Sequence, residues 1–349
     1  MPLFNAIDGF LFRYDEVTDA APHLRDANNL KRMFIIVVFA ALPSALTGIY
    51  FFGWRGFMMI LVSYTVGLSV EITFSVIRKT EISEGAFVTC LLFPLILPPD
   101  LPLWMVGLGI FVATLFGKEV FGGTGYNIFN PALVGRVFLY VCFPTAMSWN
   151  WVQPMSGMGG FASFRGESLG ELTGSASSAT PAADVVTMAT PMAAFPSAEQ
   201  LPSLVELFLG NIAGSLGETS ALMIILGGTI LVVTRIADWR IPLSFITSAS
   251  IFSFLLHLNN PAAFPPLGYQ LLSGGLLFGA FFMATDPVTS PFSKPGRWVF
   301  GAMCGFLTIL IRGFSGYPEG VMFAILFMNL FTPLIDHLVL HFRFRGHGR

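Results

Sequence analysis

The chain has 349 residues and a formal net charge of −2, and 54% of its residues are hydrophobic while only 11% are charged. A soluble domain carries about 25% charged residues, so this composition, with a mean hydropathy of +0.73, excludes an ordinary soluble protein. The near-neutral charge offers no basic surface for nucleic acid, and we expect no nucleic-acid partner.

Apolar runs recur along the chain from residue 33 to residue 340. They are continuous rather than alternating, which favours membrane-spanning helices over a barrel. We therefore predict an all-α polytopic membrane protein with about ten transmembrane helices. The predicted spans are 33–52, 57–77, 86–99, 103–117, 128–146, 220–235, 242–257, 267–284, 298–312 and 320–338. Several are shorter than the roughly 20 residues that a bilayer requires, as in discontinuous helices that line a site.

The three cysteines, Cys90, Cys142 and Cys304, lie far apart, each inside an apolar run. This spacing excludes a self-contained iron–sulfur or zinc site of the usual kind, so we expect no bound metal centre. We interpret the three thiols as small, buried apolar fillers.

A long polar interval divides the predicted spans into two groups of five, and an odd number per group predicts inverted halves. The predicted division is an N-terminal segment 1–32, a first membrane half 33–146, a loop 147–219, a second half 220–340 and a basic tail 341–349. Fourteen of the eighteen Lys and Arg residues fall on the side of the termini. The positive-inside rule then predicts cytoplasmic termini and an outward-facing, periplasmic loop.

Four acidic residues lie where lipid should not tolerate them: Glu71, Glu119, Asp286 and Asp336. Buried charges of this kind normally face the interior of a bundle or mark an ion path, and carboxylate oxygens suit Na⁺ or H⁺. The alternative is that each side chain reaches the interface or caps a helix, with Asp286 before Pro287 as a plausible N-cap. For Glu71 the alternative is an ion pair with the basic residues that follow seven positions later.

The segment 117–136 is rich in glycine and asparagine. It is neither a P-loop nor a dinucleotide-binding fingerprint, because no G-K-[S/T] follows and no strand precedes it. Its glycines allow close approach to a flat ligand, and they are Gly122, Gly123 and Gly125. Asn127 and Asn130 offer amide hydrogen bonds, and Asn130-Pro131 is expected to begin a helix. The alternative is a simple break between two helices.

The polar loop contains P-A-A-D-V-V-T-M-A-T at 181–190, in which Asp184, Thr187, Ala189 and Thr190 form the pattern D-x-x-[S/T]-x-A-T. This pattern resembles the flavinylation motif of a membrane redox family, in which the last threonine carries flavin mononucleotide (FMN) through a phosphoester bond. The alternative is an ordinary solvated loop of low complexity.

A set of strings in the same order extends this resemblance over nearly the whole chain. They are S-E-G-A-F-V-T at 83–89, G-K-E-V-F-G-G-T-G at 117–125, N-P-A-L-V-G-R at 130–136, A-T-D-P-V-T at 284–289, G-R-W-V-F-G at 296–301 and L-F-T-P-L-I-D-H at 330–337. The chain resembles the family that contains the B-type subunit of the Na⁺-translocating NADH:quinone oxidoreductase and the D-type subunit of the Rnf ferredoxin:NAD oxidoreductase.

The resemblance implies cofactors and roles that the residues alone do not show. Thr190 would carry covalent FMN, although Thr187 and Met188 stand where Ser and Gly are common. A second, non-covalent riboflavin would lie in the membrane domain, and ubiquinone or menaquinone would be reduced near the cytoplasmic side. Glu119, Asp286 and Asp336 match acidic positions implicated in Na⁺ uptake.

The resemblance thus implies a translocase component of the bacterial inner membrane that passes electrons to quinone coupled to Na⁺ export. No residue of this chain is expected to act as a catalytic acid, base or nucleophile. The chain has no dinucleotide fingerprint or suitable cysteine set, so partner subunits would supply the NADH, FAD and iron–sulfur sites. A second FMN-carrying subunit and small membrane subunits would complete the complex. Two alternatives remain: the corresponding Rnf protein, and a secondary transporter without redox chemistry.

Overall fold

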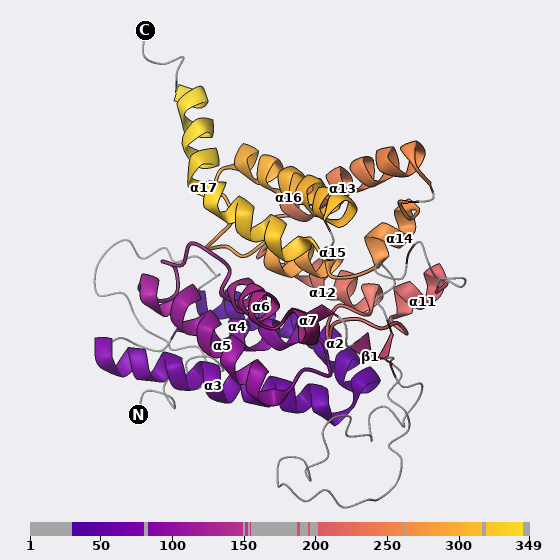
Figure 1. Cartoon of the computed structure of the whole chain (residues 1–349). Helices are drawn as coiled ribbons and strands as arrows, with labels where there is room; N and C mark the ends of the chain where they lie inside the picture. The colour runs from indigo at the N-terminus through magenta and orange to yellow at the C-terminus, as the bar shows by residue number, and fades with distance from the viewer. Residues whose placement is uncertain are drawn as a thin grey trace, which may run out of the picture.

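The computed structural model describes residues 30–79, 83–148, 151–152, 154, 187–188, 195, 202–261, 263–315 and 319–344 (Figure 1). These residues are predominantly helical. Within them, strand pairing is confined to two-residue strands: β1 (Trp151–Val152) pairs antiparallel with β2 (Thr187–Met188).

The helices coincide with the ten predicted spans. The first group comprises α2 (Leu30–Phe52), α3 (Trp54–Arg78), α4 (Gly85–Leu95), α5 (Leu103–Gly117), the 3₁₀ turn η1 (Glu119–Phe121), α6 (Pro131–Cys142) and α7 (Pro144–Ser148). The second comprises α11 (Leu204–Leu209), α12 (Ala221–Val233), α13 (Arg240–Asn259), α14 (Leu267–Leu272), α15 (Leu276–Phe278), the π-helical η2 (Gly279–Met283), α16 (Lys294–Phe314) and α17 (Val321–Phe344).

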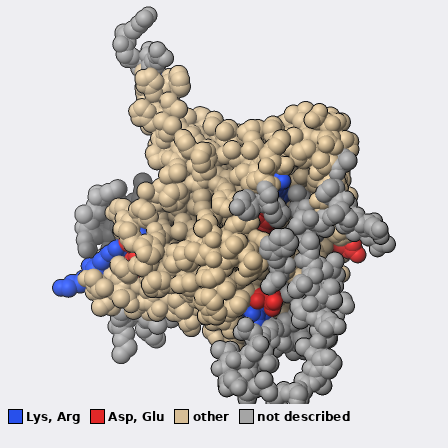
Figure 2. Space-filling view, viewed as in Figure 1, with Lys and Arg blue, Asp and Glu red and all other residues tan. Residues whose placement is uncertain are grey.

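By length and composition, six helices among the described residues can cross a membrane. They are Lys31–Phe52, Trp54–Arg78, Leu103–Phe121, Arg240–Asn259, Lys294–Phe314 and Val321–Phe344. Three more apolar helices are shorter: Gly85–Leu95, Pro131–Cys142 and Ala221–Val233. Figure 2 agrees, because charged side chains form only a few small groups on the face that it shows. The prediction of an all-α polytopic membrane protein is confirmed.

Local chemistry explains where the shorter helices begin and end. Asn130 caps α6, since its side chain accepts a hydrogen bond from the Ala132 N–H and Pro131 occupies the first turn. The eighth predicted span is instead divided into α14, α15 and η2, and Gly274 at the first break has a φ of +65°, a conformation that favours glycine.

The two groups of helices repeat one packing pattern. In the first, α3 packs on α4 and α5, and α6 packs on α5. In the second, α13 packs on α14 and α16, and α17 packs on α16. Across the boundary, α2 packs on α12 and α6 on α17, so equivalent helices meet (Figure 1). This pattern is what repeated halves require, while their inversion relative to the membrane stays a prediction.

The core is continuous across this boundary and contains two of the three thiols. Cys90 and Cys304 are fully buried, as predicted, whereas Cys142 is exposed at the end of α6. The interpretation of Cys142 as a buried filler was therefore wrong: it occupies the last position of the helix, beyond the buried stretch.

Candidate functional site

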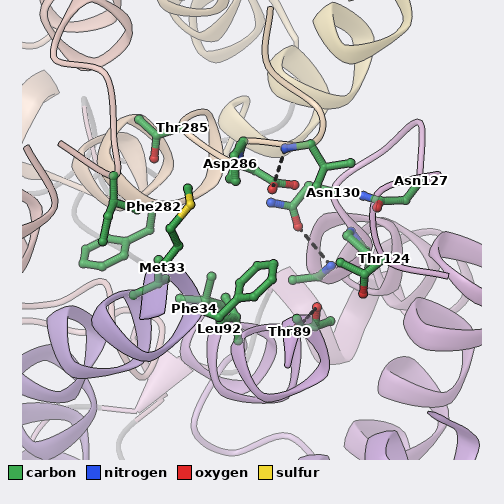
Figure 3. Close-up of a pocket in the computed structure, with 18 of the residues that line it drawn as sticks. Met33, Phe34, Thr89, Leu92, Thr124, Asn127, Asn130, Phe282, Thr285 and Asp286 are labelled. Atoms are coloured by element: carbon green, nitrogen blue, oxygen red, sulfur yellow. Dashed lines mark hydrogen bonds between the residues drawn. The ribbon is translucent and has the colours of Figure 1, made fainter. Parts of the chain in front are cut away.

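A cavity lies between the two halves, at the end of the bundle where α6 begins (Figure 3). It encloses about 820 Å³, including its open mouth. Its apolar walls include Met33, Phe34, Val37, Val88, Leu92 and Phe282. Its polar lining includes Thr89, Lys118, Thr124, Asn127, Asn130, Thr285 and Asp286. Apolar walls with a few convergent polar groups are typical of a site for a small ligand or cofactor.

Asn130 connects the two halves at the wall of the cavity. Its Oδ1 accepts the hydrogen bond that caps α6, at 3.1 Å from the Ala132 nitrogen. Its Nδ2 donates to the Met283 carbonyl in η2, at 3.4 Å. One side chain thus fixes both the start of α6 and its distance from the other half. The prediction that Asn130 begins a helix is confirmed.

The loop before α6 obtains its shape from three glycines. Gly122, Gly123 and Gly125 have φ values of +126°, +99° and +96°, which other residues rarely adopt. The glycines do not themselves line the cavity, whereas Thr124 and Asn127, on either side of Gly125, do. The glycines therefore turn the backbone so that these neighbouring side chains reach the cavity. Ligand binding at the glycines stays a prediction.

Asp286 lies in the wall that the second half contributes. Its carboxylate accepts hydrogen bonds from the Val288 N–H at 3.3 Å and from the Thr289 hydroxyl at 3.2 Å. These bonds close a turn, and the next helix begins only at Lys294, so the alternative of a helix N-cap for Asp286 was wrong. Burial raises the pKa of this carboxyl, while the two hydrogen bonds oppose that shift.

Glu71 and Glu119 lie together behind the cavity, each with a basic partner. The Lys118 ammonium is 2.8 Å from both Glu71 oxygens, and this pair is buried. Glu119 instead pairs with Arg78 at 2.9 Å. The alternative pairing of Glu71 with the basic residues that follow it was therefore wrong. Because Lys118 also lines the cavity, it connects the cavity to this acidic pair.

Asp336, the fourth predicted acid, lies apart from the cavity. Its carboxylate accepts hydrogen bonds from the backbone N–H groups of Phe292 and Ser293, each at 3.1 Å, and from the Ser293 hydroxyl. It therefore holds the segment that leads into α16. The structure gives this residue a clear role in positioning, and its part in an ion path stays a prediction.

Three residues of the predicted flavin motif, Asp184, Ala189 and Thr190, lie outside the described residues. Thr187 and Met188 form β2, which pairs with β1 just after the first half. The backbone of the motif is thus tied at one point to the end of the first half.

Sequence reasoning missed two features. Lys118 was noted only as a charge after a span, although its place directly before Glu119 could have indicated a pair with a buried acid. Arg136 lies inside α6 and binds Glu218 at 3.0 Å, with Glu319 as its second acidic partner. A lone arginine within a predicted span was the available signal for this second cluster. No group of three or more His, Cys, Asp or Glu suited to a metal occurs among the described residues.

The fold and the cavity together define a polytopic helical membrane protein whose two halves enclose a site for a small ligand, with buried ion pairs beside it. Residues 17–345 match the model of the NQR2, RnfD, RnfE family, and the chain belongs to this family.

Individual relatives agree with this assignment. The B-type subunit of the Na(+)-translocating NADH-quinone reductase of Pseudomonas paraeruginosa is 38% identical, over 97% of this chain and 91% of the relative. Proteins of the same name from Klebsiella pneumoniae and Yersinia pestis are each 36% identical, with the same coverage. By homology, the chain is the B-type membrane subunit of a Na⁺-translocating NADH-quinone reductase, and thus part of a multi-subunit complex. The predicted resemblance is confirmed.

Proposed function

We propose that this protein carries covalent FMN at Thr190 and a non-covalent riboflavin in the cavity, and passes electrons to quinone coupled to Na⁺ export. The observation that supports the riboflavin is the cavity itself. Its volume of about 820 Å³ suits a three-ring system, and Phe34 and Phe282 provide apolar walls for a flat ring. Asn127 and Lys118 provide donors at its edge.

Riboflavin, when bound, supplies one- and two-electron chemistry, and the chain sets its surroundings. Lys118 places a positive charge at the cavity, while Glu71 and Glu119 place negative charges behind it. A gain of negative charge in the cavity favours Lys118 and disfavours nearby anions that hold no cation. Cation capture at Glu119 or Asp286 is thus coupled to the charge in the cavity through short-range electrostatics.

A cavity-filling variant tests the riboflavin site. Val88→Trp places a large ring where the flavin would lie, so the purified complex is expected to lose one acid-releasable riboflavin and keep its covalent FMN. Chromatography of released flavins measures the first quantity, and gel fluorescence measures the second. Val76→Trp is the matched control, because Val76 is 62% exposed on α3 and does not line the cavity. Unchanged riboflavin with lost quinone reduction would make the cavity a quinone site instead.

The acidic residues at the cavity are expected to govern the Na⁺ dependence of quinone reduction. Glu119→Gln and Asp286→Asn should each weaken stimulation by Na⁺, because each removes a carboxylate that a cation could bind. Asp238→Asn is the control, since Asp238 pairs with Arg240 and Arg297 and does not line the cavity. The raised pKa of Asp286 also predicts that the Na⁺ concentration required falls as pH rises, because protons then compete less. Steady-state titrations with Na⁺ measure both effects, and an unchanged Na⁺ requirement in the two variants would refute this role.

A further inference from the structure

A second buried group of charges lies farther along α6, beyond the cavity. Arg136 is 4% exposed and donates to Glu218 Oε1 at 3.0 Å, to Glu319 and to the Ser215 hydroxyl at 3.4 Å. Arg312, in the last turn of α16, donates to the carbonyls of Gln270 and Ser273 at 2.8 and 3.1 Å. Two arginines and two glutamates thus balance in charge inside the protein.

The ion pairs of Arg136 differ from the others because they join the two halves. Arg136 belongs to α6 of the first half, whereas Glu218 and Glu319 directly precede α12 and α17 of the second. Every other ion pair between described residues lies within one half, as Arg55 with Asp100 does. Breaking the Arg136 pairs therefore releases a connection between the halves and leaves each half intact.

The cluster contains polar atoms that the described residues leave without a partner. Glu218 is 5% exposed, and its Oε2 accepts no hydrogen bond; the same holds for Oε1 of Gln270, which is 2% exposed. Buried carboxylate and amide oxygens without donors are costly unless they receive a cation, a proton or water. These oxygens are also the ligands that a small hard cation prefers.

The cluster and the cavity lie on the same boundary. Asn130 and Ala132, at the start of α6, line the cavity. Arg136 follows Asn130 by six residues, which corresponds to about 9 Å along a helix at 1.5 Å per residue. Since α6 leads towards the loop 147–219 and Glu218 ends that loop, the cluster closes the boundary between the cavity and the loop side.

We propose that Arg136, Glu218 and Glu319 form the gate of the ion path on the side of the loop 147–219. The carboxylates bind the passing cation transiently, whether Na⁺ or H⁺. The guanidinium of Arg136 is the resident cation that occupies them at other times and so prevents back-flow. This inference rests on the proposed ion transport, but not on the riboflavin in the cavity.

Passive ion flux through the intact complex in proteoliposomes, without NADH, tests the gate. Arg136→Gln leaves two buried carboxylates without their cation, so the leak of ²²Na⁺, or of protons reported by a pH dye, should rise several-fold. The two readouts distinguish the ions. Arg55→Gln is the matched control: Arg55 is also buried, and it donates to the carbonyls of Pro99, Asp100 and Leu101, but within one half.

A second variant covers the case in which Arg136→Gln does not assemble. Glu319→Gln keeps the pair of Arg136 with Glu218, so it should lower the number of ions moved per electron without a leak. An unchanged leak in Arg136→Gln, an equal leak in Arg55→Gln, or an unchanged ion-to-electron ratio in Glu319→Gln would overturn the gate. Because the leak is measured without turnover, failure of the riboflavin proposal would not alter this result.

Discussion

A Thr190→Val variant is expected to lose all covalently bound flavin from this protein. A phosphoester requires a hydroxyl, and valine has nearly the shape of threonine without it. The polypeptide should therefore show no fluorescent band under ultraviolet light on a denaturing gel. Intact-mass spectrometry should find it lighter by one FMN than the parent. Electron transfer to quinone should fall with it, because the relay would lack one carrier.

The chain contains its own control for this experiment. Thr180 also occurs in an A-T-P string, as Thr190 does, but position 174, six residues earlier, is glycine where Asp184 precedes Thr190. Thr180→Val should therefore keep the full flavin signal, and Asp184→Ala should reduce it. A fluorescent band that survives in Thr190→Val and disappears in Thr180→Val would contradict the motif assignment.

A Lys118→Met variant is expected to destabilise the protein strongly. The change leaves the Glu71 carboxylate buried without the ammonium that is 2.8 Å away. Breaking a buried ion pair at one partner costs about 3–5 kcal/mol. Thermal unfolding of the purified complex, followed by size exclusion, should show a lower midpoint and early release of non-covalent flavin.

The double variant Lys118→Met with Glu71→Leu separates charge from packing. It removes both charges, so most of the lost stability should return. Arg78→Met is a useful comparison, because the Arg78 side chain is 31% exposed and solvent can partly replace it beside Glu119. Equal destabilisation in the single and double variants would show that packing of the lysine stem, rather than its charge, supports this region.

Features that depend on short-range sequence were predictable, and long-range pairs were not. Asn130 caps α6 because Asn-Pro specifies a helix start locally. Glu71 was expected to pair seven residues later, but that offset is two helical turns, or about 10.5 Å, and too far for contact without a bend. Its partner Lys118 is 47 positions away, and only packing of α3 on α5 brings the two together.

The same reasoning explains the site residues. Asp336 was expected in an ion path from its depth alone, but its contacts with Phe292 and Ser293 cross more than 40 positions and depend on the docking of α17. The break at Gly274 left only a weak signal, because its neighbours are as apolar as an unbroken span. Hydropathy therefore located the spans, while their interruptions and ion pairs needed three dimensions.

Contact between equivalent helices, α2 with α12 and α6 with α17, is the isologous arrangement by which two identical copies associate. Two identical copies would have to place the same residue on both sides of the axis. Joining the copies in one polypeptide removes that constraint, so Lys118 can face the cavity from one half and Asp286 from the other. The covalent connection thus allows a polarised chamber that a symmetric dimer could not build.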